Sequence, residues 1–393
     1  MRFVLEKLKG DRVIWIVVII LSMISMAAVY TSISSLAYKY HGGNTEYYFM
    51  KHGFLIILGL GLMYVAHLAP YRLYSRIAQI AIYITIPLLV FTLFSGTNLN
   101  SASRWLTLPV INLSFQTSDM AKLALIMYLA RILSKNQHQI TDFKKGFVMI
   151  ITPILLTVLL IFPANFSTAA VLFATSFVIM FIGGIQMRHL AILVASLLVG
   201  VLLLFAVAKV APNILPRAGT WISRVESFLD KDDASGNFQA NQAKIAIATG
   251  HTFGKMPGNS EQKNFLPHPY SDFIYAIIIE EYGAIGGVVV LFLYMTLLYR
   301  SVRIATKSPG TFGTFLSIGL AFSLVFQAMI NMGVAVNLLP VTGQPLPLIS
   351  MGGTSLWFTS ISIGIILSVS RQEEELEEEY SDTNTKNVSY AAS

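Results

Sequence analysis

Long apolar stretches recur along the whole chain, and short polar segments separate them. At about 1.5 Å per residue, each stretch can cross a hydrocarbon core of about 30 Å as an α-helix. The pattern predicts an all-α polytopic membrane protein with about ten transmembrane helices. The predicted helices cover Trp15–Leu36, His52–Tyr71, Ile77–Phe94, Asp119–Leu133, Gly146–Phe162, Ser167–Gly184, His189–Val207, Asp272–Arg300, Thr311–Val336 and Met351–Val369.

Two segments interrupt this rhythm. Residues 209–271 form the only long loop, between the seventh and eighth predicted helices, and its apolar spacing predicts short surface helices at Ile222–Leu229 and Gln239–Thr249. Residues 371–393 are acidic and then rich in Ser, Asn and Thr, which is typical of a solvated, disordered tail. We therefore expect one transmembrane domain over residues 1–370, followed by a disordered cytoplasmic tail.

Basic residues are distributed unevenly over the loops between the predicted helices. The loops of one face carry most of the Lys and Arg, whereas the short loops of the other carry only Lys39, Lys51 and Arg104. Since basic loops stay on the cytoplasmic side, both termini are predicted to be cytoplasmic and the long loop extracytoplasmic. This bias accounts for the formal net charge of +7 without nucleic-acid binding, because no basic stripe with interleaved aromatic residues accompanies it.

The composition narrows the chemistry. With 55% hydrophobic residues, 12% charged residues and a mean hydropathy of +0.66, the chain is unlike a soluble domain of its size. The absence of Cys excludes disulfides and thiolate metal sites. The seven His residues include no His-x-x-x-His pair, so a structural metal site is not expected.

Ionisable residues close to hydrocarbon gather at the outer face. Each costs about 2.5–3.5 kcal/mol at a helix centre on insertion scales, so its presence needs a reason. Asp272 opens the eighth predicted helix, and Asp119 and Lys122 open the fourth at the same face. Together with residues of the outer loops they predict an outward-facing pocket, in which one carboxylate faces several cations. The loop residues of this pocket are Arg104, Trp105, Arg217, Arg224, Lys244 and Lys263.

Each of these residues also has a purely structural interpretation. Asp272, next to Ser271, could serve only as the N-cap of its helix. Asp119 and Lys122 are three residues apart and could form a local pair at a helix start. Trp105 is typical of a membrane-interface anchor. The sequence leaves both the functional and the structural interpretation open.

Two further acids, Glu280 and Glu281, lie inside the eighth predicted helix. On a straight helix Glu280 lies about 12 Å deeper than Asp272 in a similar direction, and Glu281 faces nearly the opposite way. This geometry disfavours a glycoside hydrolase, whose two carboxyl groups flank one bond at about 5–9.5 Å. Transfer from a sugar diphosphate needs instead one carboxylate to deprotonate the attacking hydroxyl and cations to stabilise the leaving group.

A series of motifs carries a family resemblance over nearly the whole membrane part of the chain. The motifs are Ser103–Leu106, Phe115–Lys122, Asn241–Ala246, Gly258–Ser260, Phe265–Pro267, Ser271–Tyr275, Glu280–Gly283 and Leu339–Ser355. In this order they resemble the SEDS family (shape, elongation, division and sporulation), and Pro340–Gly353 favours its FtsW-like division branch over its RodA-like elongation branch. Thr117 and Asp119 replace the family's Pro and Glu, and Pro163–Thr168 lacks a carboxylate that relatives usually carry.

The resemblance implies a peptidoglycan glycosyltransferase that polymerises lipid II during septal cell-wall synthesis, with Asp272 matching the family's essential acid. It implies a class B penicillin-binding protein transpeptidase as partner, other divisome membrane proteins nearby, and a multi-pass location in the bacterial inner membrane at the division septum. It identifies no certain cofactor, and assistance by Mg²⁺ or Mn²⁺ at the diphosphate stays open. The motifs add these candidates for substrate binding: Gln116, Ser118, Asp119, Lys122, Gln242, Glu280 and Ser350.

A lipid II flippase or another transporter is the main competing function. Transporters place charges near the membrane midplane on broken helices and often show internal repeats. Here the charges crowd the outer level and no repeat is evident, although Glu280, Glu281 and the Pro340–Pro347 loop fit a transporter. An elongation-type polymerase and a non-catalytic scaffold that recruits the transpeptidase also stay open.

Overall fold

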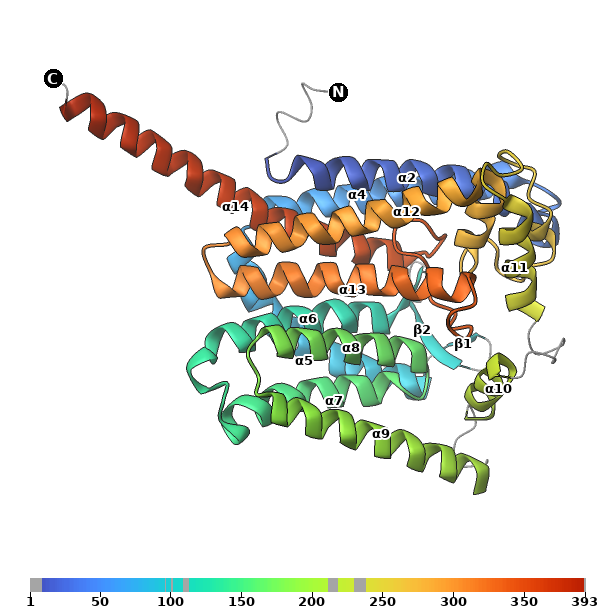
Figure 1. The fold of residues 1–393 in the computed structure, drawn as a ribbon, viewed down its shortest axis with the longest axis horizontal. Helices are drawn as coiled ribbons and strands as arrows, with labels where there is room; N and C mark the ends of the chain where they lie inside the picture. Colours follow the sequence, from blue (N-terminus) through green and yellow to red (C-terminus); the bar gives the residue numbers. More distant parts are fainter. Residues whose placement is uncertain are drawn as a thin grey trace.

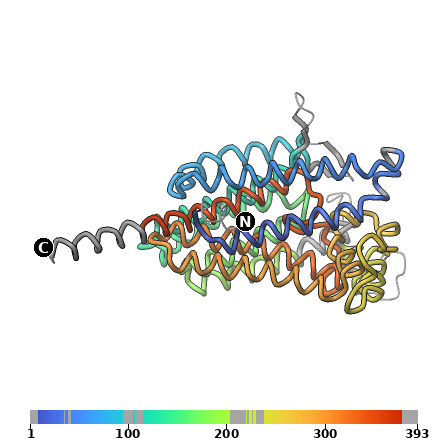
Figure 2. The backbone as a smooth tube through the Cα atoms, turned by 90° about the horizontal axis from the view of Figure 1, so that it is seen from above, coloured from blue at the N-terminus to red at the C-terminus, as the bar shows by residue number. Residues whose placement is uncertain are grey.

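The computed structural model describes residues 9–95, 97–99, 102–108, 113–210, 218–229 and 238–391. Most of its helices lie along one common direction and pack side by side into a bundle (Figures 1 and 2). The helices are α2 Arg12–Ser32, α3 Ser34–His41, α4 Thr45–Leu68, α5 Tyr71–Ser95, α6 Thr117–Lys135, α7 Met149–Ile161, α8 Phe166–Ile182, α9 Met187–Val210, α10 Ala218–Leu229, α11 Phe238–Gly250, α12 Ile274–Lys307, α13 Thr311–Ala335 and α14 Thr354–Ala391. Short helices of other types are η1 Gln137–Gln139, η2 Phe143–Val148 and η3 Gln262–Asn264.

Every range predicted to be a membrane helix overlaps a helix of the structure. Within the described residues, six helical segments are long and apolar enough to cross a membrane, and two shorter ones are also apolar. The chain is therefore a mostly helical protein with several membrane-spanning segments, while the number of ten spans and their orientation stay predictions. The six segments are α2, α4, α5, η2 with α7, α12 and α13, and the shorter ones are α8 and the first part of α9.

Helix α6 occupies the interior of the bundle. It contacts α5, α7, α8 and α13, and it has buried residues on every face. An interior helix is shielded from lipid by its neighbours, so charged side chains on it can be paired inside the protein. This position explains how α6 carries Asp119 and Lys122 near its start.

Helix α12 is interrupted at Gly283, whose φ of 73° and ψ of −176° are not helical. Its first segment, up to Tyr282, folds back on the second. The evidence is a hydrogen bond of 3.1 Å that the Tyr275 hydroxyl donates to the Gly287 carbonyl. On a straight helix these two residues would lie about 18 Å apart. The expectation of a straight eighth helix is therefore wrong, and the reversal brings Asp272 against α13.

Residues 251–254 of the long loop pack against this reversal through their backbone. The Ala284 N–H donates to the His251 carbonyl at 2.9 Å, so a helix end that the break exposes finds a partner. A Cβ on Gly254 would lie 2.2 Å from a backbone oxygen of α12, and a Cβ on Gly283 would lie 2.1 Å from a backbone oxygen of the loop. Both residues also have positive φ, so only glycine fits at these two positions.

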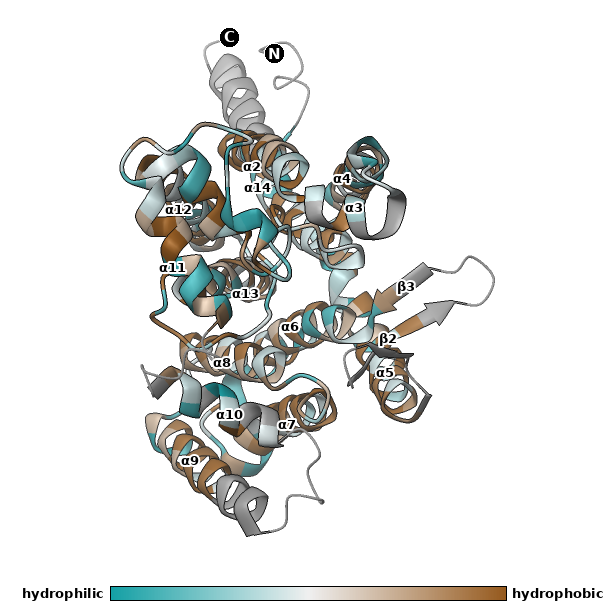
Figure 3. Ribbon diagram, turned by 90° about the vertical axis from the view of Figure 1, so that its right-hand side faces the viewer, coloured by the Kyte–Doolittle hydropathy of each residue, from teal (hydrophilic) through white to brown (hydrophobic). Residues whose placement is uncertain are grey.

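A small antiparallel sheet corrects the all-α prediction. Its strands are β1 Thr97–Leu99, β2 Ala102–Leu108 and β3 Leu113–Gln116, in the order β1-β2-β3. Trp105 lies opposite Gln116 in the ladder, directly before α6. Figure 3 shows β2 and β3 at the edge of the bundle beside α5 and α6. Strands this short lack the continuous apolar run that identifies a membrane helix, so the sequence pattern predicts only a loop here.

The N-terminal end of the described chain contacts α14 at the opposite end of the bundle from the sheet, where α14 leaves the bundle (Figure 1). The Gly10 N–H donates to Glu374 Oε2 at 2.6 Å, so the chain enters and leaves the bundle on the same side. Helix α14 continues to Ala391. The sequence pattern instead predicts a disordered tail from residue 371 onward. Arg371–Tyr380 is rich in Glu, a good helix former, and contains no Gly or Pro, which explains the difference.

Candidate active site

Asp272 lies at the end of the long loop, two residues before α12 begins. The Ser271 hydroxyl donates to Asp272 Oδ1 at 2.9 Å, and the side chain stays partly exposed. The N-cap position belongs to Phe273, and no side chain caps the helix there. The interpretation of Asp272 as only an N-cap is therefore wrong. Within the described residues no hydrogen bond reaches Oδ2, so this oxygen is available to accept a proton.

Among the described cations of the long loop, Arg224 on α10 interacts electrostatically with Asp272. Its Nη1 donates to the Val341 carbonyl at 3.2 Å, while the side chain remains accessible to solvent. Desolvation of the guanidinium by neighbouring atoms lowers the pKa of Arg224, and the negative charge of Asp272 opposes this effect. An arginine stays protonated despite such a shift. Arg224 therefore supplies a permanent positive charge beside the carboxylate.

The segment between α13 and α14 folds over Asp272. Gly343 has φ of +65°, and a Cβ added there would lie 3.5 Å from Asp272 Oδ2. The Ser350 hydroxyl donates to the Ser271 carbonyl at 2.6 Å, and the Met351 N–H donates to the Tyr270 carbonyl at 3.0 Å. Ser350, predicted to bind substrate, thus ties this segment to the residue before Asp272.

Two amides on α13 hold the same region, and the sequence motifs do not point to them. Asn331 Nδ2 donates to the Asp272 carbonyl at 2.9 Å and to the Gln344 carbonyl at 2.7 Å. Gln327 Nε2 donates to the Pro345 carbonyl at 2.9 Å. Their spacing could have identified them, because two amides four residues apart on an apolar helix lie on the same face.

Asp119 and Lys122 form the ion pair that their spacing predicts, with Nζ and Oδ1 2.8 Å apart. Lys122 Nζ also donates to Gln327 Oε1 at 2.9 Å. Asp119 Oδ2 is buried, and it has no hydrogen-bond partner within the described residues. The pair is therefore connected to the Asp272 region through Gln327 and the segment after α13.

The candidates on the small sheet form one edge of this region. Gln116 Nε2 donates to the Ser118 hydroxyl at 2.8 Å, and the Gln116 N–H donates to the Thr354 hydroxyl at 3.3 Å. Trp105 lies opposite Gln116 in the strand ladder. The backbone of Arg104 belongs to β2, but its side chain lies outside the described part of the structure.

Glu280 is completely buried and accepts four close hydrogen bonds from the loop that leads to Asp272. Burial lowers the pKa of Lys255, but the hydrogen bonds and charges of Glu280 and Glu261 together outweigh it and raise this pKa. The oxygens of Glu280 are occupied within the chain, so the structure places this residue as an anchor of the loop. The donors are Lys255 Nζ at 3.1 Å, Ser260 Oγ at 2.5 Å, and the N–H groups of Glu261 at 3.1 Å and Gln262 at 3.3 Å.

The remaining candidates of the long loop lie apart from these contacts. Lys244 is exposed on α11, and Lys263 Nζ donates to a backbone carbonyl of its own loop at 2.7 Å. In the part of the chain that the structure describes, neither residue hydrogen-bonds to Asp272, and the same holds for Gln242. Arg217 lies outside the described residues.

The described residues do not build a metal centre. No three His, Asp or Glu side chains among them lie close enough to hold a metal ion. Mg²⁺ is commonly held by one or two carboxylates together with phosphate groups of the substrate, so this finding applies only to a site built by the protein alone.

Comparisons with known proteins agree with one another. Residues 11–375 match the profile of a family described as cell cycle protein, FtsW/RodA/SpoVE. The stage V sporulation protein E of Bacillus subtilis is 32% identical over 375 residues, which cover 93% of this chain and 98% of the relative. The probable peptidoglycan glycosyltransferase FtsW of Geobacter sp. (strain M18) is 34% identical over 369 residues, which cover 92% and 96%.

The same architecture occurs in a solved structure. It is described as "Structural coordination of polymerization and crosslinking by a peptidoglycan synthase complex". One of its chains superposes with a TM-score of 0.72 at 26% identity, and the match covers 93% of this chain and 98% of the other. The likeness thus includes nearly all of both chains.

Proposed function

Because the chain belongs to the FtsW, RodA and SpoVE family, we propose that it is a peptidoglycan glycosyltransferase that polymerises lipid II into glycan strands during septal cell-wall synthesis. One observation carries the proposal. Within the described structure, the Asp272 carboxylate has a free oxygen beside the positive charge of Arg224, at the outer end of a membrane-spanning bundle. This is the pairing of base and cation that transfer from a lipid-linked sugar diphosphate needs.

In this reaction Asp272 acts as general base. A hydroxyl of the acceptor sugar gives its proton to Oδ2 while its oxygen bonds to the anomeric carbon of the donor. The bond between that carbon and the diphosphate oxygen breaks, and the lipid diphosphate leaves with the electron pair. Arg224 stabilises the negative charge that develops on the leaving group. No general acid is required, because the diphosphate leaves as an anion.

The other polar residues support this centre or bind the substrate. The segment after α13, held by Gln327, Asn331 and Ser350, positions Asp272 through its backbone. The Asp119–Lys122 pair supports that segment from α6. We assign contacts with the sugars and the diphosphate to the outer-face candidates Arg104, Trp105, Gln116, Ser118, Arg217, Gln242, Lys244 and Lys263.

A class B penicillin-binding protein transpeptidase is the proposed partner. The similar solved chain belongs to an assembly described as coordinating polymerization and crosslinking, which supports this assignment. We place the protein in the bacterial inner membrane at the division septum, together with other divisome proteins, because relatives named FtsW match over nearly its whole length.

The break in α12 bears on the flippase hypothesis, because transporters use broken helices at the membrane midplane. Two contacts between the α2 region and α12 show how deep in the membrane the break lies. Arg300 pairs with Asp11 at 2.6 Å, and Thr31, near the other end of α2, donates to Glu281 at 2.9 Å. Asp11 and Thr31 are about 30 Å apart along α2, one hydrocarbon thickness. The break therefore lies at the outer boundary, where residues 251–254 cover it, and this favours the enzyme.

The proposal is tested with the purified protein and its matching transpeptidase in proteoliposomes that contain lipid II. Glycan strands are expected on gels, and lipid II translocation is measured in parallel. If no strands form although the transpeptidase crosslinks added strands, while lipid II crosses the bilayer, the protein is a flippase. If neither activity appears, the scaffold hypothesis replaces both.

A further inference from the structure

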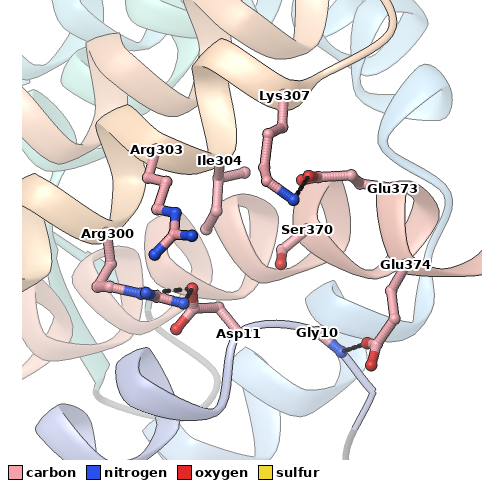
Figure 4. A pocket seen from close by; sticks show the side chains of 9 residues that line it. All are labelled: Gly10, Asp11, Arg300, Arg303, Ile304, Lys307, Ser370, Glu373 and Glu374. Carbon is pink, nitrogen blue, oxygen red and sulfur yellow. Dashed lines mark hydrogen bonds and ion pairs between the residues drawn. The ribbon is translucent and has the colours of Figure 1, made fainter. Parts of the chain in front are cut away.

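A polar cavity lies at the other end of α12 from Asp272. Its volume of about 250 Å³ greatly exceeds the roughly 10–15 Å³ that one water molecule needs. Three parts of the chain that are far apart in sequence form it: the start of α2, the last turns of α12 and the part of α14 that leaves the bundle (Figure 4). It is separate from every residue assigned above to glycan polymerisation.

Three cations of α12 line the cavity, and two of them are neutralised. Arg300 pairs with Asp11 at 2.6 Å, and Lys307 pairs with Glu373 at 3.3 Å. Their spacing along α12 places Arg300, Arg303 and Lys307 on neighbouring turns of one side of the helix. The third cation, Arg303, differs from the other two in its contacts.

The Arg303 guanidinium has no hydrogen bond or ion pair within the described residues, and Figure 4 shows it pointing into the cavity between Arg300 and Ser370. The Ser370 hydroxyl lines the same space and likewise has no hydrogen bond within the described chain. Glu374 lies on another wall, where it accepts the Gly10 N–H at 2.6 Å. As far as the chain is described, the cavity thus contains one free cation, one free hydroxyl and a carboxylate with remaining acceptor capacity.

We infer that this cavity binds a phosphodiester monoanion that carries a hydroxyl group. The fork of a guanidinium matches two phosphate oxygens, so Arg303 is the donor suited to hold the phosphate. Ser370 donates to a third oxygen. The carboxylate of Glu374 disfavours a second negative charge on the ligand and accepts a hydrogen bond from its hydroxyl group. A dianionic phosphate monoester fits this arrangement less well.

The position of the cavity suggests where such a ligand comes from. It lies at the level of the Arg300–Asp11 contact, one hydrocarbon thickness from the Thr31–Glu281 contact. This is the headgroup level of the predicted cytoplasmic leaflet, where phosphatidylglycerol presents the required phosphodiester and hydroxyl groups. Basic pockets between membrane helices on this side bind anionic headgroups in other proteins. A soluble glycerophosphodiester offers the same chemistry from the cytoplasm.

The test compares the full-length protein in nanodiscs of phosphatidylcholine with and without phosphatidylglycerol. Native mass spectrometry counts the phosphatidylglycerol that stays bound, and calorimetry measures binding of soluble glycerophosphoglycerol. Arg303→Gln is expected to lower retention of the lipid about tenfold, the size expected for losing charge-assisted hydrogen bonds. Ser370→Ala should lower it by a smaller factor. The matched control is Arg188→Gln, an exposed cation on the first turn of α9 outside the cavity, and it should change nothing.

Melting temperatures in detergent show whether each variant is folded, and Arg303→Lys, which keeps the charge but not the fork, replaces a variant that is not. Binding of the soluble probe that depends on Arg303, without retained lipid, supports the site and identifies the cytoplasm as the source. Equal losses in Arg303→Gln and Arg188→Gln overturn the proposal. Absence of binding by the lipid and by the soluble probe also overturns it.

Discussion

The two ends of α12 handle charge in opposite ways. At the end predicted to be cytoplasmic (the inner end), Arg300 and Lys307 are paired directly with carboxylates from other parts of the chain. At the end predicted to be extracytoplasmic (the outer end), Asn331 holds the backbone of Asp272, and the carboxylate remains partly exposed. In a direct ion pair, charged side-chain atoms of both partners are occupied by each other. A hydrogen bond to the backbone leaves the side chain free to react. The outer end is therefore arranged for chemistry and the inner end for attachment.

The largest effect is expected from Asp272→Asn, which should lower glycan polymerisation by about 10²–10⁴-fold, because an amide cannot accept the proton of the attacking hydroxyl. Asn keeps the shape of the side chain, so the protein should remain folded and bound to its partner. Strand formation from lipid II is the measurement, with melting temperature and partner pull-down as controls. Full activity in a folded variant would remove Asp272 from the mechanism.

Arg224→Ala is expected to lower polymerisation about 10–100-fold, since it removes the charge that stabilises the diphosphate beside Asp272. Lys244→Ala is the comparison variant, because Lys244 is also assigned a contact with the substrate and is exposed on the same long loop, but it does not contact Asp272 in the described structure. Its loss should be several-fold smaller. Initial rates at limiting lipid II separate the two variants. Equal losses would mean that the loop acts only through its overall charge.

Asn331→Ala should reduce activity about tenfold and lower the free energy of unfolding by about 1–3 kcal/mol, because one buried and one partly buried carbonyl lose their donor. Ser317→Ala on the same helix is the control, since Ser317 is buried without a hydrogen bond within the described residues. That substitution should be nearly neutral in both measurements. Loss of stability in Asn331→Ala with an unchanged turnover number would show that backbone support at the outer end does not position Asp272.

The smallest effect on polymerisation is expected at the inner end. Asp11 pairs with Arg300 and caps α2 by accepting the N–H groups of Val13 and Ile14. Asp11→Ala should therefore lower the free energy of unfolding by about 1–2 kcal/mol and leave the turnover number unchanged. Thermal unfolding in detergent and the strand assay test this pair of expectations. A turnover number that fell as far as in Asn331→Ala would erase the contrast between the two ends.

Hydrophobic pattern alone located the long helices, because lipid imposes length and apolarity on any segment that crosses it. It could not reveal the reversal of α12. Gly283 follows Glu280 and Glu281 in a segment that is otherwise apolar, and glycine is common in membrane helices, so hydropathy does not distinguish a break there from a tolerated residue. The small sheet was not predicted either, because its strands are too short to give a recognisable hydrophobic pattern.

The sequence predicted the acidic residues of the candidate site and some of its basic residues. Asp272, Arg224, Asp119 and Lys122 stood out because charge near hydrocarbon is costly and therefore informative. Asn331 and the other amide of α13 did not, because neutral amides inside a bundle are usually satisfied without a special role. Likewise no spacing rule could show that Glu280 faces the preceding loop, since that contact depends on the reversal of the chain.

The close contact of Gly254 with Gly283 also shapes how this protein can vary. The two residues meet through main-chain atoms, so neighbouring side chains such as Phe253, which is 80% exposed, are free of this restriction. A side chain at either glycine cannot be relieved by a smaller residue at the other, because no side chain is there to shrink. No substitution at one of these positions can therefore compensate for a substitution at the other. We expect both glycines to be retained together while the residues around them vary.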